Sequence, residues 1–178
     1  MDQRQGQQGG SPPQGNQRIH RARDYPLRRK EPARGEGEEV KLEGRIWKDE
    51  RTNYWVVDVP LLDISTQGRS RKDALAMIED AIQLEAGKEG LKIQAELSRE
   101  KGNFTVSAND PDLLIAFLLR RQRTSHGLSV REVASRLHSS SPTAYSQYEQ
   151  GKRAPSLGKL WDLLHAIDPQ LDAVLKAD

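Results

Sequence analysis

The chain contains no cysteine, and aromatic residues make up only 5% of its 178 residues. Without cysteine, neither a disulfide framework nor a thiolate metal site can form. No apolar run approaches the roughly 18 residues that a membrane-spanning helix needs. The first residues also lack the apolar stretch of a secretory signal. These absences favour a protein of the reducing cytoplasm.

The residue spacings that mark an enzyme are absent as well. Asp58, Asp63 and Glu79 fall in a predicted strand, a loop and a helix, with no spacing that suggests a magnesium-dependent nuclease. There is no glycine-rich phosphate loop. We therefore expect no catalysis, no metal and no cofactor, with a residual metal-dependent nuclease as an alternative. No histidine has a partner at metal-ligand spacing, and the four are His20, His126, His138 and His165.

Charge is distributed unevenly along the chain. The net charge is +5 over residues 1–35, −6 over residues 36–119 and +3 over residues 120–178. Such asymmetry indicates different partners for different segments, although imbalances of this size are also common on solvated surfaces.

Residues 1–38 consist of Gln, Gly, Pro and Arg with hardly an aliphatic side chain. Such a segment buries too little surface to offset the entropy of ordering, so we predict a disordered basic tail. Its most basic stretch, residues 18–30, has the charge to touch nucleic acid non-specifically. A merely solvated arm and a misplaced start codon are equally open interpretations.

Residues 39–109 show the patterns of a small α+β domain. Apolar and polar residues alternate over 40–47, the period of a half-buried strand, residues 54–59 are a strongly β-prone run, and alternation returns over 91–97. A turn at 49–53 makes the first two a hairpin, and Pro60 closes the second. Extended pieces are also predicted at 63–68 and 103–108. Between them, Ser70 and Asp73 begin a helix whose buried stripe is Leu75, Ile78 and Ile82, flanked by Ala74 and Ala81, and which Gly87 ends.

Residues 110–178 contain only helical patterns. Asp110 is a plausible N-cap, and Pro111 suits the first helical position, where its missing N–H costs nothing. The periodicity predicts an all-α domain of five helices, at 111–123, 129–138, 142–150, 156–167 and 169–176.

The second and third of these helices are short and joined by a tight turn. Ser129 begins the helix at 129–138 and Ser141 begins the helix at 142–150. Gly151 ends the latter helix in a left-handed conformation. Two helices so joined predict a helix-turn-helix. The third predicted helix buries Tyr145 and Tyr148 and keeps its other face polar, as a helix that enters the DNA major groove must. A protein-binding helical module is the alternative.

Short polar side chains reach base edges and phosphates without a bulk penalty, and basic side chains at the helix exit neutralise phosphates. On this basis the predicted DNA-binding residues are Thr143, Ser146, Gln147, Lys152 and Arg153, together with Arg131 on the preceding predicted helix.

The segment "LSVREVASRL…SPTAYSQYEQGKRAPSLGKLWDLL" resembles the Cro/cI-type repressor domains, which typically carry a Tyr-Glu-x-Gly-Lys-x-x-Pro-like stretch. In two respects the chain departs from that pattern. Val130 stands where a glutamine usually opens the first of the two helices, and the turn has one extra residue, so the family's base preference does not transfer. The matching residues are Tyr148, Glu149, Gly151, Lys152, Arg153 and Pro155. The resemblance implies that the groove-facing positions, and so further predicted DNA-binding residues, are Ser141, Pro142, Thr143 and Gln147.

The segment "YWVVDVPLLDISTQGRSRKDALAMIEDAIQL" (54–84) resembles the HicB antitoxin domain, with its Val-Pro hairpin end, its Thr-Gln-Gly turn and its Ala-rich helix. "SANDPDLLIAFLLRRQR" (107–123) is similar to the connection that precedes a helix-turn-helix in HicB proteins. Together these resemblances span residues 40–170.

The HicB resemblance implies a truncated RNase H-like β-β-β-α-β(-β) module that covers a HicA-type RNA-cleaving toxin. It also implies a helix-turn-helix that dimerises and represses the shared promoter. The acidic charge of residues 36–119 fits a partner with a basic surface. We expect a homodimer or a dimer of dimers on an inverted repeat of operator DNA. A free-standing repressor with a ligand-sensing α+β domain is the alternative. The candidate toxin contacts are Trp47, Tyr54, Asp58 and Asp63, although aromatic residues on strands are more often core.

Overall fold

The computed structural model describes residues 40–139 and 141–171. The described residues all belong to one compact unit. The predicted disordered tail, residues 1–38, lies outside the described residues, and so does most of the helix expected at 169–176. Residues 169 and 170 form a turn. The predicted boundary between domains at 109–110 stays a prediction.

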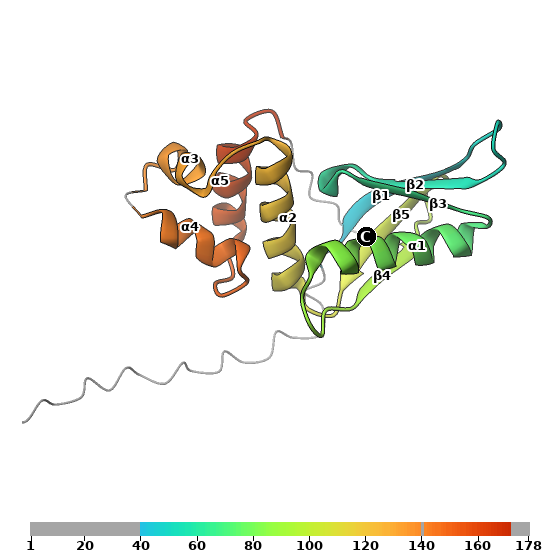
Figure 1. Ribbon diagram of the computed structural model, residues 1–178, viewed down its shortest axis with the longest axis horizontal. Helices are drawn as coiled ribbons and strands as arrows, with labels where there is room; N and C mark the ends of the chain where they lie inside the picture. The colour runs from blue at the N-terminus through green and yellow to red at the C-terminus, as the bar shows by residue number, and fades with distance from the viewer. Residues whose placement is uncertain (1–39, 140, 172–178) are drawn as a thin grey trace, which may run out of the picture. The chain divides into compact units, whose positions relative to one another are not determined.

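The predicted β-β-β-α-β-β order is confirmed, and the protein is α+β (Figure 1). Five strands form one antiparallel sheet in the order β3-β2-β1-β5-β4. We call residues 40–108, which form the sheet and the helix that covers it, the sheet module. Strands β4 and β5 come after that helix in the chain, and β5 pairs with β1. The first and last strands of the sheet module therefore lie next to each other in the sheet. The strands are β1 (Leu42–Lys48), β2 (Trp55–Val59), β3 (Ile64–Gly68), β4 (Ile93–Leu97) and β5 (Asn103–Ala108).

The turns of the first strands are set by local hydrogen bonds. The Asp49 carboxylate accepts from the backbone N–H groups of Thr52 and Arg51, and these bonds lower the pKa of Asp49. After β2, Pro60–Leu62 forms a single 3₁₀ turn, η1. Asp63 follows with φ +50, in the left-handed region, and its N–H donates to the Pro60 carbonyl.

One face of the sheet forms the core of the module. The strands alternate as predicted, so that Leu42, Ile46 and Val57 point inward and are buried. Gly44 lies in the same row of β1. A Cβ at Gly44 would stand 2.3 Å from the Phe104 ring, so only glycine lets β1 and β5 pack this closely.

Helix α1 (Arg71–Ala86) covers this face. Ser70 accepts from the Asp73 N–H, and Gly87 ends the helix at φ +59, both as predicted. The buried stripe is Ala74, Ile78, Ile82 and Ala86, which repeats every four residues. Leu75 is only half-buried, because it stands one position off this repeat. The predicted burial of Ile78 and Ile82 is therefore confirmed, whereas Leu75 lies at the edge of the buried stripe.

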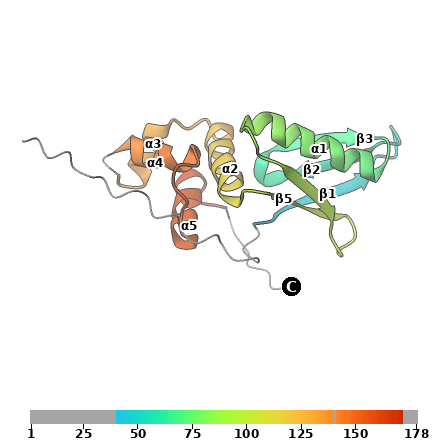
Figure 2. The same ribbon diagram turned by 90° about the horizontal axis from the view of Figure 1, so that it is seen from below.

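Helix α2 (Pro111–Ser125) begins at Asp110, whose carboxylate accepts from the N–H groups of Asp112 and Leu113. All six residues from Leu114 to Leu119 are buried. A helix buried on every side must pack against several elements. Helix α2 contacts β5 and η1 as well as α4 and α5, and both Figure 1 and Figure 2 show it between the sheet module and the remaining helices.

The remaining helices are α3 (Val130–Arg136), α4 (Pro142–Glu149) and α5 (Leu157–Ile167). Helix α5 buries Leu163, Leu164 and Ile167. The Arg136 guanidinium on α3 donates to the last carbonyls of α5, those of Ala166 and Ile167, and so ties these helices together. In the described part of the chain, no helix has the length and hydropathy to cross a membrane.

Candidate nucleic-acid interface

Helix α3 begins with a reciprocal cap. The Ser129 hydroxyl accepts from the Glu132 N–H, and the Glu132 carboxylate accepts from the Ser129 N–H at 2.7 Å. These bonds lower the pKa of Glu132. At the other end, His138 adopts φ +53, and the N–H groups of His138 and Ser139 donate back to the carbonyls of Ser135 and Ala134. This closure turns the chain tightly towards α4.

Helix α4 is as short as predicted, and its two ends differ. Ser141 stands at the N-cap position, but its side chain makes no capping hydrogen bond. At the C-terminal end, Gly151 has φ +70, and the N–H groups of Gly151 and Lys152 donate to the carbonyls of Tyr148 and Gln147. This left-handed closure confirms the predicted stop at Gly151.

The buried face of α4 carries the two tyrosines, as predicted. Tyr145 is 2% exposed and Tyr148 is 7% exposed. The Tyr145 hydroxyl is buried beside Arg123 and Glu149 without a hydrogen bond of good geometry. Burial and the neighbouring Glu149 raise the pKa of Tyr145 well above its usual value. Both tyrosines therefore belong to the core and leave the opposite face of α4 to the solvent.

A buried ion pair fastens α4 to α2. The Arg123 guanidinium binds both carboxylate oxygens of Glu149, at 2.6 and 3.0 Å, and its third nitrogen donates to the Leu128 carbonyl. Hydrogen bonding to Glu149 raises the pKa of Arg123. Glu149 belongs to the stretch that resembles the Cro/cI-type domains, but its pairing with Arg123 was not predicted from the sequence. The sequence signal for this pairing is the position of Glu149 between a buried tyrosine and the glycine that ends the helix.

The exposed face of α4 holds the central residues of the predicted interface. Thr143 and Gln147 are exposed one turn apart, and Ser146 is half-buried beside them. Ser141 is exposed and Pro142 half-buried at the start of the helix. These side chains share the solvent side of one helix, which is the placement that base contacts require.

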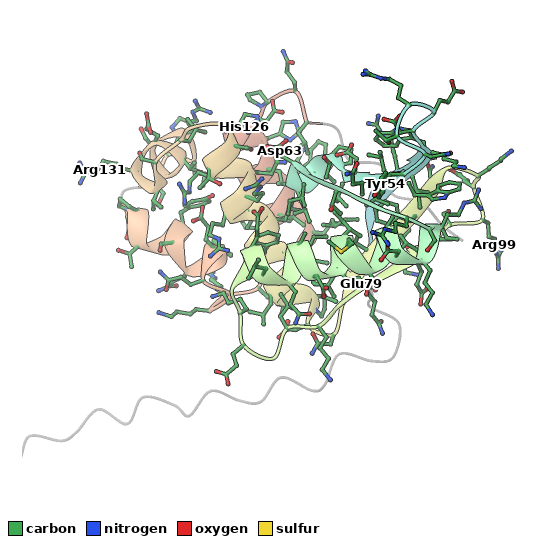
Figure 3. All side chains as sticks on the ribbon, turned by 45° about the vertical axis from the view of Figure 1, so that its right-hand side comes forward. Tyr54, Asp63, Glu79, Arg99, His126 and Arg131 are labelled. Carbon is green, nitrogen blue, oxygen red and sulfur yellow. The ribbon has the colours of Figure 1, made fainter. Side chains whose placement is uncertain are left out.

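The basic residues flank this face. Lys152 and Arg153 are exposed directly after α4, and the Arg153 guanidinium lies 5.3 Å from the centroid of the Tyr148 ring. Arg131 is exposed on α3, and Figure 3 shows it projecting away from the rest of the protein.

Gln150 is a further polar residue of this face that the sequence analysis missed. It is exposed at the C-cap of α4, and its side-chain amide donates to the Ser146 hydroxyl at 2.8 Å. Gln150 follows Gln147 by three residues and Thr143 by seven, the spacings that place helical side chains on one face, and this spacing was the sequence signal for it.

Residues 119–170 match a protein-family model described as helix-turn-helix. The match covers α3, α4 and α5 and the last turns of α2, and it does not extend to the sheet module. The comparisons with curated proteins and with solved structures found no match. The C-terminal helices therefore form a helix-turn-helix of the Cro/cI type, which supports DNA binding by this part of the chain.

The predicted toxin contacts lie at different places on the sheet module. Trp47 is 46% exposed on the sheet face opposite α1, where it pairs across the strands with Val56. Asp58 is half-buried on β2. Figure 3 shows Tyr54 and Asp63 well apart, with Asp63 next to α2. Trp47 is thus available to a partner. The Asp63 carboxylate already faces the Arg121 guanidinium, with 3.8 Å between the nearest oxygen and nitrogen.

Two of the carboxylates considered for catalysis, those of Glu79 and Asp63, already contact other groups of the protein. Glu79 accepts from the Ala95 N–H on the edge strand β4 at 2.7 Å. Over residues 40–139 and 141–171, no group of three or more histidine or acidic side chains is placed to hold a metal ion. His126 contacts the Gln122 carbonyl, and the His165 ring packs at a tilt of 45° against the Trp161 ring, with ring centroids 4.2 Å apart. His20 lies outside the described residues.

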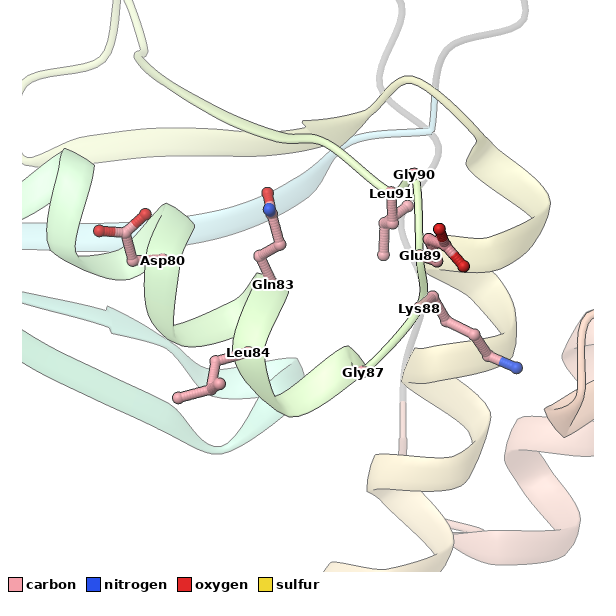
Figure 4. Close-up of a pocket in the computed structure, with 8 residues that line it drawn as sticks. All are labelled: Asp80, Gln83, Leu84, Gly87, Lys88, Glu89, Gly90 and Leu91. Carbon is pink, nitrogen blue, oxygen red and sulfur yellow. The ribbon is translucent and has the colours of Figure 1, made fainter.

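An open cavity of about 610 Å³ lies where α1 ends and the chain turns towards β4 (Figure 4). Six of its eight lining residues are exposed, and Leu91 is the one that is buried. Small-molecule sites usually bury most of the ligand surface. This cavity encloses little, so it lends no support to a ligand-sensing role for the module.

Proposed function

We propose that the protein is a cytoplasmic repressor that binds operator DNA through α4 and neutralises a HicA-type toxin through its sheet module. In this proposal α4 enters the major groove, and a homodimer places two copies of α4 on an inverted repeat. Recognition helices of such dimers act about one helical turn of DNA, roughly 34 Å, apart.

The observation that carries the DNA half is the exposed polar face of α4 beside Lys152 and Arg153. Glutamine pairs with adenine through two hydrogen bonds in the major groove, and hydroxyls bond to bases or phosphates. Gln147 stands in the middle of this face and is therefore the proposed main base contact. Lys152 and Arg153 supply the contacts to phosphate that hold the helix in register.

We predict that Gln147→Ala lowers affinity for the operator by about ten- to hundredfold. The affinity for unrelated DNA and the unfolding temperature should not change, because the side chain is exposed and carries no charge. Fluorescence anisotropy with promoter and random duplexes measures both affinities. The matched control is Gln83→Ala, an exposed glutamine on α1. Equal operator affinity of the wild type and Gln147→Ala would refute this placement of α4.

The toxin half rests on the HicB resemblance of residues 54–84 and on the acidic charge of residues 36–119. An RNA-cleaving toxin must present a basic surface to its substrate, and an acidic module complements such a surface. The relation of the module to RNase H is part of the same proposal. Trp47 is its best candidate contact, since a half-exposed tryptophan is a common anchor in protein interfaces.

Co-expression tests this half directly. The small open reading frame next to the gene is expressed alone and together with the protein, and growth is followed. We expect arrest by the neighbour and relief by co-expression, with weaker relief by Trp47→Ala. A harmless neighbour, or arrest that the protein does not relieve, would leave a repressor without a toxin partner.

A further inference from the structure

Four consecutive residues near the C-terminal end of α2 each reach another element of the fold. They are Arg120, Arg121, Gln122 and Arg123, and the first three bond to the sheet module while the fourth bonds to α4. Successive side chains of an α-helix point about 100° apart, so four in a row surround the helix. Rotation or sliding of α2 therefore breaks at least one of these contacts.

Most of the contacts to the sheet module are made to backbone carbonyls, and Arg121 also forms an ion pair with the Glu85 carboxylate at 2.9 Å. Arg120 donates to the carbonyls of Glu85 and Ala86 at the end of α1, at 2.8 and 3.0 Å. Arg121 donates to the carbonyls of Leu62 and Asp63, at 2.6 and 2.8 Å. These carbonyls end α1 and η1 and have no partner within their own helical turns, so the arginines complete both ends.

Gln122 is the central contact of the three. Its side chain is 6% exposed, and its amide donates to the Leu61 carbonyl in η1. A buried amide must find a hydrogen-bond partner, so this bond ties η1 to one rotational position of α2. At the same residue, the backbone carbonyl accepts from the N–H of His126 at the end of α2.

On the other side, α4 is held at its C-terminal end. Arg123 binds the Glu149 carboxylate, and the Lys88 ammonium donates to the Gln150 carbonyl at 3.3 Å. Lys88 belongs to the loop after α1, as Figure 4 shows, so this second contact runs directly from the sheet module to the end of α4. The orientation of α4 thus depends on contacts that begin in the module.

We propose that Arg120, Arg121 and Gln122 are positioning residues for DNA binding, which couple the sheet module to the recognition helix α4. A change at η1 or at the end of α1 shifts α2, and Arg123 carries that shift to Glu149. The proposal rests on the assigned role of α4 in DNA binding. Coupling between two sites is reciprocal, so DNA bound to α4 also steadies η1.

The coupling is tested first in the free full-length protein by amide hydrogen exchange. Gln122→Met keeps the length of the side chain and removes the donor, which limits the cavity that Gln122→Ala would leave. We expect the Lys152 amide, which bonds to the Gln147 carbonyl, to exchange about tenfold faster in the variant. Gln83→Ala should leave it unchanged. Faster exchange at the Asp63 amide alone, with Lys152 unaffected, would overturn the proposal.

The second measurement uses operator DNA. Gln122 is too buried to contact DNA, so we expect Gln122→Met to lower operator affinity about tenfold only through α4. In the wild type, saturating operator DNA should slow exchange of the Asp63 amide, and Gln122→Met should abolish this protection. The internal control is the Asn103 amide at the start of β5, which donates to the Glu100 carbonyl in the β4–β5 turn. Among the described residues, no α2 side chain forms a hydrogen bond to this turn.

The two measurements separate this inference from the proposed function. A wild-type protein that binds no DNA would refute the role of α4, while the exchange of Lys152 in the free variant would still decide the coupling. If Gln122→Met does not fold, Arg120→Ala, whose side chain is only part-buried, takes its place with the same expectations. Suppose that a folded variant binds operator DNA with wild-type affinity, and that operator DNA protects the Asp63 amide in neither the variant nor the wild type. This result would overturn the coupling and leave the proposed role of α4 in place.

Discussion

Replacing Glu149 by alanine is expected to lower the free energy of unfolding by about 3–5 kcal/mol. The side chains of Arg123 and Glu149 are 15% and 7% exposed, and the pair is bidentate. Removal of the carboxylate leaves the guanidinium charge buried, and among the described residues the Leu128 carbonyl is its remaining hydrogen-bond acceptor. Urea denaturation followed by circular dichroism measures the loss.

The double variant Arg123→Leu with Glu149→Leu is the control for this prediction. Replacement of both partners by apolar residues removes the unpaired charge, so the double variant should be more stable than Glu149→Ala. If Glu149→Ala costs less than about 1 kcal/mol, the value of an exposed ion pair, the pair does not hold α4 on α2.

Replacing Tyr145 by alanine is expected to cost about 3–5 kcal/mol, the range for truncation of a large aromatic side chain in a core. Tyr145 is among the largest fully buried side chains of the described residues. Tyr145→Phe keeps the ring and removes a hydroxyl that makes no well-formed hydrogen bond, so its stability should stay within about 1 kcal/mol of the wild type. A larger loss in Tyr145→Phe would show that the hydroxyl bonds to the Arg123–Glu149 pair.

The same residue predicts a loss of stability at alkaline pH. The pKa of Tyr145 is raised in the folded state, so above the unfolded value of about 10 the unfolded chain releases a proton that the folded protein retains. The unfolded state then binds fewer protons, and the free energy of unfolding falls as pH rises. Denaturation at pH 9 and pH 11 should show a smaller loss in Tyr145→Phe than in the wild type.

The local elements were predictable because their signals are local. Ser70, Gly87, Asp110 and Gly151 each stand where a helix begins or ends, and capping depends on a few neighbouring residues. Strand alternation located β1 and β4, and β propensity located β2, for the same reason. The burial of Tyr145 and Tyr148 followed from helical spacing, which places one face of a short helix towards its neighbours.

The exposed polar face of α4 was predictable in part. Thr143, Ser146 and Gln147 were found because a helix-turn-helix needs short polar residues there, while Gln150 was missed because it falls at the cap. Its amide bond to Ser146 depends on the conformation of the last turn of α4.

The sequence by itself determined the elements, their order and the helix-turn-helix, since capping, periodicity and turn chemistry act over a few residues. Only the tertiary structure decided that β5 pairs with β1, that Glu149 is buried against Arg123, and that Gln122 bonds to η1. These pairs lie 26 to 64 residues apart in the chain. Their formation depends on how whole elements pack to bury apolar surface, and no local pattern carries that information.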